Sequence, residues 1–224
     1  MKKKQFKMPL IGLLFWGAFA ILGCRSMEIG LKEKLGIPKR DQMVKEVTRA
    51  RDAQNQAKEQ FASALEQFTT VLNVDGGDLE KKYKTLNREY EQSKSRAEAV
   101  SERIERVKEV SVALFKEWEK ELDQYSSAQL RNASRRQLEQ TRRSYDRLIG
   151  AMERARDKID PVLSAFKDQV LFLKHNLNAR AIASLQGQLS SIESDIAVLV
   201  RDMETSIAEA DSFIKQMTGE TEIH

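Results

Sequence analysis

The sequence predicts an all-α protein: an elongated antiparallel helical bundle or coiled coil of about four long helices, preceded by a signal-peptide helix. From residue 39 onward, apolar side chains recur at alternating spacings of four and three residues, the pattern of helices packed along one seam. Over the same stretch Pro161 is the only proline and glycines are few, which favours long helices over a sheet with many turns.

Residues 1–23 have the layout of a secretory signal peptide. Four lysines within the first seven residues precede an uncharged, mostly apolar run over residues 8–23. This run has about 16 residues, whereas a membrane-spanning helix needs roughly 20. We therefore expect cleavage rather than a permanent membrane helix.

The end of this run resembles the lipoprotein box of bacterial lipoproteins. Ile21, Leu22 and Gly23 precede Cys24, although Leu22 is bulkier than the pattern. The resemblance implies cleavage between Gly23 and Cys24 and attachment of acyl chains such as palmitate at the Cys24 thiol. Arg25, rather than Asp, after the cysteine implies export to the outer membrane. The alternative is that Cys24 is only one more apolar residue of the run.

The rest of the chain divides by composition. We expect a lipid-anchored tether over residues 24–38, an elongated helical-bundle domain over residues 39–218 and a disordered tail over residues 219–224. The bundle should contain four segments of roughly 35, 47, 50 and 40 residues, running up, down, up and down. After the first seam ends at Val71, a glycine pair breaks the helix, and Asp78 is placed to cap the second segment.

The third segment contains Pro161, which usually ends or kinks a helix. The apolar register passes through Pro161 without a phase change, so we predict one kinked helix that ends near residues 175–178. The alternative is a turn at Pro161 followed by one very long helix. Burial of the seams within one chain and burial in a dimeric coiled coil both satisfy the pattern.

Charge gives little support for nucleic-acid binding. The net charge of +4 equals the four lysines of the signal peptide, so the body is formally neutral, and we expect no nucleic-acid partner. Residues 131–158 hold nine bases and four acids, and residues 189–211 hold six acids and one base. We expect these blocks to lie side by side. The basic run from Arg131 to Arg147 is then a solvated face opposite an acidic neighbour, rather than a site for anionic lipid or polymer.

The residues for catalysis are scarce. One cysteine and two histidines are too few for most metal centres, and the sequence contains no glycine-rich nucleotide motif and no H-E-x-x-H. We expect no cofactor, no metal and no enzymatic activity. The densest polar cluster comprises Lys174, His175, Asn176, Asn178 and Arg180. It could contact a partner, but we favour a structural cap, because Asn and His at a helix end satisfy backbone groups.

Three stretches carry a family resemblance: Lys39, Arg40 and Asp41, then residues 114–119, and above all residues 171–180. Together they resemble an uncharacterised family of Gram-negative bacterial proteins with a domain of unknown function, often described as lipoproteins. The resemblance covers about residues 27–217. It implies an exported, lipid-anchored, all-helical protein, and it supplies no activity, ligand or catalytic residue.

These observations favour a non-enzymatic scaffold or spacer on the periplasmic side of the cell envelope, held to the outer membrane through Cys24. Its partners would be envelope proteins or further copies of itself. The main alternative is a ligand-sensing or lipid-handling bundle that admits a small apolar molecule. An envelope hydrolase that uses His175 is the weakest alternative.

Overall fold

The computed structural model describes residues 38–73, 78–176 and 179–219, and every regular element within them is an α-helix. The predicted all-α fold is therefore confirmed. The predicted signal peptide, the tether up to residue 37 and most of the tail lie outside the described residues. The helices are α2 (Lys39–Asn73), α3 (Leu79–Leu122), α4 (Ala128–His175), α5 (Ala179–Gln186) and α6 (Leu189–Thr218).

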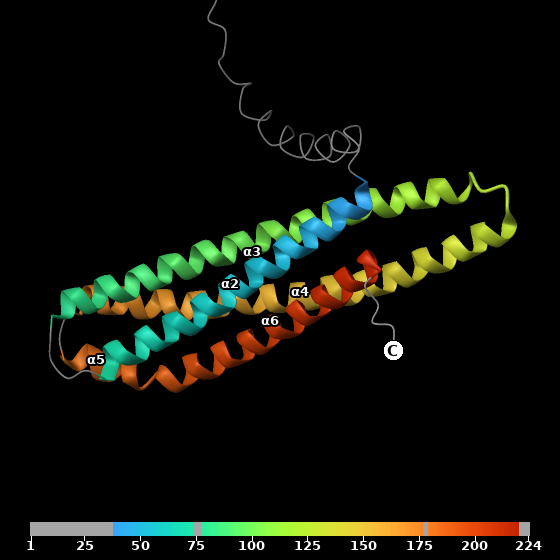
Figure 1. Cartoon of the computed structure of the whole chain (residues 1–224). Coiled ribbons are helices and arrows are strands. Elements are labelled where there is room, and N and C mark those ends of the chain that lie inside the picture. The colour runs from blue at the N-terminus through green and yellow to red at the C-terminus, as the bar shows by residue number, and fades with distance from the viewer. Residues whose placement is uncertain (1–37, 74–77, 177–178, 220–224) are drawn as a thin grey trace, which may run out of the picture.

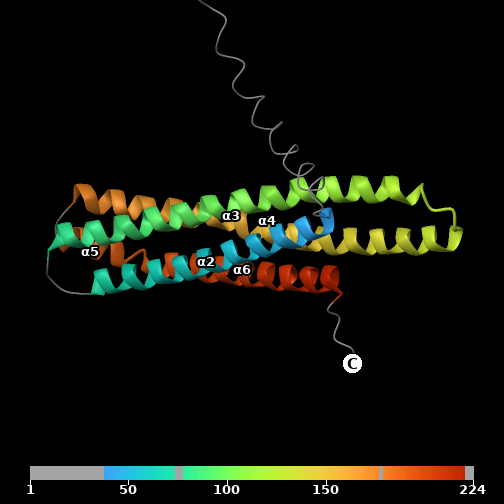
Figure 2. The same ribbon diagram turned by 45° about the horizontal axis from the view of Figure 1, so that its top comes forward.

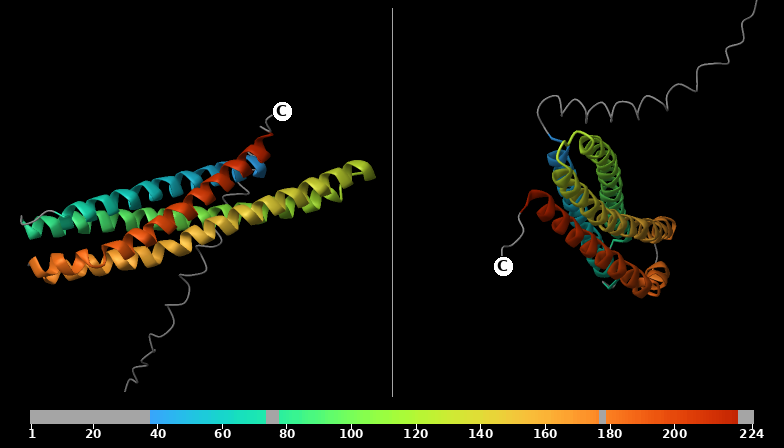
Figure 3. Two further views of the ribbon diagram at one scale, coloured as in Figure 1. Left: turned by 90° about the horizontal axis from the view of Figure 1, so that it is seen from below. Right: turned by 90° about the vertical axis from the view of Figure 1, so that its right-hand side faces the viewer.

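The four long helices form a ring in which each packs against two neighbours (Figures 1 and 2). Both α3 and α6 contact α2, and both contact α4, so α2 and α4 occupy opposite corners. Successive long helices run in opposite directions, as predicted, and seen end-on they surround a common axis (Figure 3). The apolar seams are thus buried within one chain. None of the described helices is both long enough and apolar enough to cross a membrane.

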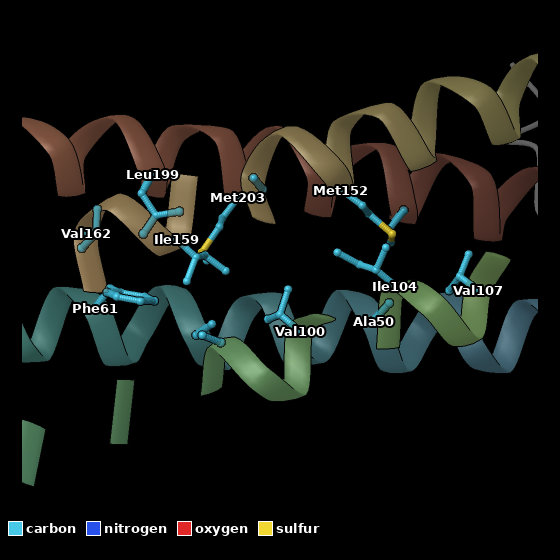
Figure 4. Close-up of a cluster of buried hydrophobic side chains, with 14 of the residues drawn as sticks. Ala50, Phe61, Val100, Ile104, Val107, Met152, Ile159, Val162, Leu199 and Met203 are labelled. Atoms are coloured by element: carbon cyan, nitrogen blue, oxygen red, sulfur yellow. The ribbon is translucent and has the colours of Figure 1, made fainter. Parts of the chain in front are cut away.

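Side chains from all four long helices fill the interior (Figure 4). Phe166 of α4 stacks on both Phe61 and Phe68 of α2, with ring centroids 6.4 and 5.8 Å apart. All three rings are at most 3% exposed. The predicted seams match this core closely. One deviation lies in the last turn of α2, where Leu72 is buried and the predicted Val71 is only half-buried.

Side-chain caps set the starts of two helices. The Asp78 carboxylate accepts hydrogen bonds from the N–H groups of Glu80 and Lys81 at 2.9 and 3.2 Å, which confirms its predicted role at α3. Ser127 caps α4 by accepting from the Leu130 N–H at 3.3 Å. At the end of α6, Gly219 has φ 78°, a left-handed conformation that costs glycine little.

α4 continues past Pro161 without interruption, so the prediction of one helix here is confirmed. Pro161 lies on the exposed side of α4, where water can satisfy the carbonyl that loses its N–H partner. Ile159 and Val162 stay buried on the opposite side.

The fourth predicted segment is wrong in one respect: it is not one helix of about 40 residues. It divides at Gly187 and Gln188 into α5, of 8 residues, and α6, of 30. Glycine weakens a helix interior by about 1 kcal/mol, and tertiary contacts here favour the break. The Gln186 side chain donates to the carbonyl of Leu72 at 2.7 Å, and Gln169 donates to the Gln188 side chain. α5 therefore covers the C-terminal end of α2 at what we call the closed end of the bundle.

The opposite end, which we call the open end, has a different construction. There α3 and α4 extend beyond the first turn of α2 and the last turn of α6, so their hairpin protrudes (Figures 1 and 2). Trp118 Nε1 donates to Ser134 Oγ at 2.8 Å across this hairpin. Arg142 pairs with Glu119 at 2.7 Å and lies over the Phe115 ring at 5.2 Å. These contacts hold α3 and α4 together at the base of the hairpin.

The stacked aromatic core predicts a large difference between two phenylalanines of α4. Phe166→Ala should lower the free energy of unfolding by about 3–5 kcal/mol, because it opens a cavity against Phe61 and Phe68. Phe172→Ala, at a side chain that is 40% exposed, should cost less than about 1 kcal/mol. Urea unfolding followed by circular dichroism checks both. Equal losses in the two variants would contradict this description of the core.

Candidate functional site

A cavity of about 660 Å³ lies at the open end of the bundle. Its walls are the first turn of α2, the last turn of α6 and the facing stretches of α3 and α4 at the base of the hairpin. It forms because α2 and α6 end while α3 and α4 continue, which leaves the inner faces of the hairpin partly uncovered. Its volume falls within the range of about 300–1,000 Å³ that is typical of small-molecule sites.

The lining combines an apolar part with polar groups around it. Leu114 of α3 and Met217 of α6 are only 7% and 5% exposed, and the half-buried indole of Trp118 lies between the body and the hairpin. Because its N–H is already bonded to Ser134, Trp118 presents mainly apolar surface to the cavity. The hydroxyl of Thr141 in α4 donates to the backbone carbonyl of Gln137 in the same helix at 2.9 Å.

Charges of both signs surround this apolar part. Lys39 Nζ pairs with Glu117 Oε1 at 2.8 Å, which links the start of α2 to α3. Arg40 donates to the carbonyl of Met217 and so ties the start of α2 to the end of α6. Glu121 is exposed, and no described residue forms an ion pair with its carboxylate. The rim thus holds two bases and two acids, and one acid is available to a ligand.

Two helix ends of opposite polarity also meet at the cavity. The first turn of α2 begins at Lys39 beside the cavity, and the N–H of Gln42 donates to the carbonyl of Pro38. The last turn of α6 ends beside it, where the Met217 carbonyl accepts from Arg40 and the Lys215 carbonyl accepts from the Gly219 N–H. The macrodipoles therefore add a partial positive charge on one side of the cavity and a partial negative charge on the other.

A second polar group lies in the middle of the core. Ser206 of α6 donates to the Gln54 side-chain carbonyl of α2 at 2.7 Å, and neither residue has exposed surface. The Gln54 amide nitrogen has no hydrogen-bond partner, nor does the buried hydroxyl of Ser93. None of these residues lines the cavity at the open end, and we assign them to packing specificity rather than to binding.

The displaced pKa values belong to groups outside the cavity. Burial raises the pKa of Tyr145, and a hydrogen bond with Ser111 opposes this shift. A hydrogen bond to Glu153 is the main cause that raises the pKa of Lys108. Contacts with Asp211 raise that of Arg51. The shifts of Lys108 and Arg51 thus arise mainly from contacts between helices. Among the residues that the structure describes, no group of three His, Cys, Asp or Glu side chains could hold a metal ion.

The predicted polar turn is described only in part. Lys174 and His175 are exposed in the last turn of α4. The Asn176 side chain donates to the carbonyl of Phe172 at 2.9 Å, so it acts as a helix cap. Asn178 and the side chain of Arg180 lie outside the described residues, as do Gly23 and Cys24. A role in partner contact at this turn remains a prediction.

The charge blocks meet only once. α4 and α6 are neighbours, as expected, but Arg147 with Glu209 at 3.8 Å is the one ion pair between their described residues. The acids of α6 turn instead to α2, where Arg51 pairs with Asp211 at 2.8 Å. The reason is geometric, because the other basic side chains of α4 that pair with a neighbouring helix face α3, as Arg156 does with Glu105 at 3.3 Å.

One face of α4 therefore keeps its positive charge. We call it the arginine stripe, and its members recur at helical spacings of seven and four residues. All are exposed, and apart from Arg147 none has an ion pair within the part of the chain that the structure describes. Gly150 lies in the stripe, where the Arg154 guanidinium approaches to 3.4 Å of a Cβ position. The stripe comprises Arg136, Arg143, Arg147, Arg154 and Lys158.

The cavity was not predicted from the sequence, although the unequal lengths of the predicted segments indicate an uncovered stretch. The second and third segments were expected to be longer than the first and fourth, so their hairpin had to outrun the other two helices. Trp118 and Glu121 continue the spacing of four and three residues from Leu114, and both line the cavity.

A comparison of the sequence with family models identifies the family of this chain. The model of a family described as "Protein of unknown function (DUF2959)" matches residues 29–217, which is most of the chain. The chain belongs to this family. The resemblance seen in the sequence is thus confirmed, while a Gram-negative origin and a lipid anchor for this DUF2959 protein stay predictions. No curated protein matches the chain.

The raised pKa of Tyr145 predicts a pH dependence. Because the folded chain holds this phenolic proton more tightly than the unfolded chain does, the corresponding stability is present below about pH 10 and is lost as the pH rises through the folded pKa. In Tyr145→Phe, the free energy of unfolding should therefore fall less steeply above about pH 10 than in the unsubstituted protein. Urea unfolding at neutral and alkaline pH checks this, and identical slopes in the two proteins would contradict it.

Proposed function

We propose that this DUF2959 protein is a lipid-anchored, non-enzymatic scaffold or spacer on the periplasmic side of the bacterial cell envelope. The observation that carries the proposal is its shape. The longest helix, α4, has 48 residues and spans about 72 Å, and the core beside it is filled by apolar side chains from all four long helices. A stiff rod of this kind holds its two ends at a fixed separation.

The sequence supports the anchor. Gly23 and Cys24 follow a basic and then apolar segment, and each acyl chain on Cys24 would add roughly 0.8 kcal/mol of membrane affinity per buried CH₂ group. Arg25 favours sorting to the outer membrane. Since Pro38 begins the bundle at its open end, an anchor at Cys24 would hold that end toward the membrane.

A scaffold also needs a contact surface, and the arginine stripe is the strongest candidate. Its bases are exposed along roughly 33 Å of α4 at 1.5 Å per residue. An acidic envelope protein would complement this charge. Most single surface pairs are weak, but an aligned row selects a partner and raises its rate of association.

The cavity at the open end supports a second candidate, a ligand-sensing or lipid-handling role. Its volume and its apolar lining suit a small molecule. A ligand would enter at this end, beside the hairpin, rather than between the packed layers of the core.

The anchor makes a direct prediction in cells. Cys24→Ala should move the protein from the outer-membrane fraction to an unprocessed or soluble form, because no thiol remains to carry lipid. Ser26→Ala, a matched change close by, should leave the fractionation unchanged. Mass spectrometry of the mature N-terminus gives the second readout. An unmodified Cys24 thiol in the mature protein would refute the anchor.

The contact surface makes a separate prediction. A variant with Arg136→Gln, Arg143→Gln and Arg154→Gln should lose at least about two thirds of the crosslinked partner recovered from intact cells. A control with three exposed lysines elsewhere changed to Gln removes the same charge and should keep the yield. Equal yields from both variants would remove the stripe from the proposal. The control lysines are Lys81, Lys94 and Lys167.

A further inference from the structure

We propose that the cavity at the open end binds a single-chain zwitterionic amphiphile of the lysophospholipid class. The inference goes beyond a scaffold role, because it gives the protein a ligand and a site for it. Volume, apolar lining and charge arrangement each restrict the ligand, and together they favour this class over a purely apolar or purely anionic molecule.

The apolar part of the lining suits a hydrocarbon chain. Leu114 and Met217 are almost completely buried, and Trp118 adds the face of a large ring. The cavity volume of about 660 Å³ is large for a simple ion or a short polar metabolite. Transfer of each CH₂ group that the cavity takes up from water contributes about 0.8 kcal/mol.

The charges select the head group. On one side of the cavity, the N-terminal end of α2 brings Lys39, Arg40 and the positive end of the helix dipole, which favour a phosphate. On another side, the exposed Glu121 carboxylate has no described partner and favours an ammonium group. Lys39 is already paired with Glu117, so the rim is close to neutral as a whole. A zwitterion satisfies both sides, whereas a purely anionic head would meet Glu121 without compensation.

The position of the cavity supplies a source for the ligand. Pro38 lines it, and the stretch between Cys24 and Pro38 reaches at most about 50 Å when fully extended. If Cys24 carries the proposed anchor, the open end stays within reach of the membrane and its single-chain lipids. Only this step rests on the proposed function; binding itself depends on the cavity alone.

Trp118 provides the measurement. Trp16 belongs to the predicted signal peptide, so Trp118 is the only tryptophan in a chain that begins at residue 24. We would use that chain with Cys24→Ser, which retains every described helix and carries no lipid. Titration with myristoyl lysophosphatidylethanolamine below its micelle concentration should shift Trp118 emission to shorter wavelength and reduce acrylamide quenching about twofold.

Comparison ligands and two pairs of variants test the site. Myristoyl lysophosphatidylglycerol, which has an anionic head, and tetradecanol, which is uncharged, should each bind at least about threefold more weakly. Glu121→Gln should abolish the preference for the zwitterionic over the anionic head. Gln137→Phe, at an exposed position on the cavity wall, should raise the Kd about tenfold, or ~1.4 kcal/mol. Gln140→Phe, exposed outside the wall, should stay within about twofold of the unsubstituted protein.

Three results would overturn the inference: no response of Trp118 to the zwitterionic lipid, equal effects of Gln137→Phe and Gln140→Phe, or equal affinity for all three amphiphiles. A fourth concerns the chain itself. If Leu35→Ser with Ile37→Ser exposed Trp118 to acrylamide in the absence of lipid, the segment before Pro38 would be the occupant. All these readouts use a chain without an anchor, so loss of the scaffold or anchor proposal would leave them unaffected.

Discussion

The architecture depends on one constraint: each long helix must bury a continuous apolar seam against neighbours that run in the opposite direction. Across the interior, Phe166 of α4 also stacks on Phe61 and Phe68 of α2, the helix at the opposite corner. The helices differ in length, since α2 and α6 have 35 and 30 residues, whereas α3 and α4 have 44 and 48. The longer pair therefore continues where the shorter pair has ended. The protruding hairpin and the cavity at its base are both results of this mismatch.

Burial of apolar seams alone would allow helices to slide past one another by one turn, because Leu, Val and Ala are interchangeable partners. The hydrogen bond between Ser206 and Gln54 limits this freedom. A shift of α6 along α2 would leave both groups without partners in the core, and an unpaired buried polar group costs about 1–3 kcal/mol. Gln54 thus has a role that its place in an apolar seam does not suggest.

Much of the fold could be predicted from the sequence, because its main determinants are local. The seam register, the cap at Asp78 and the passage of α4 through Pro161 all depend on residues close to one another in the chain. The break at Gly187 and Gln188 could not be predicted in this way, since contacts from Gln169 and from Gln186 to α2 support it. The prediction that the two charge blocks would pair with each other failed for a related reason. Charge counts per segment do not reveal which face of α4 looks toward which neighbour.

The cavity is harder to predict from local sequence than the helices are. Trp118 and Glu121 follow the seam pattern, but whether a seam residue is covered depends on where other helices end. Only the expected segment lengths hinted at an uncovered stretch. The pairing of Arg40 with the carbonyl of Met217, two residues far apart in the chain, could not have been anticipated from either residue alone.

The closed end gives the molecule a direction. There, α5 folds over the end of α2 and the Gln186 side chain donates to the Leu72 carbonyl, so this carbonyl is not available to a neighbour. At the other end, two helices project with their polar flanks in water. A rod built in this way is vectorial: two copies meeting head to head would present different chemistry from two copies meeting tail to tail. Any array of this protein would therefore inherit a polarity from the unequal lengths of its helices.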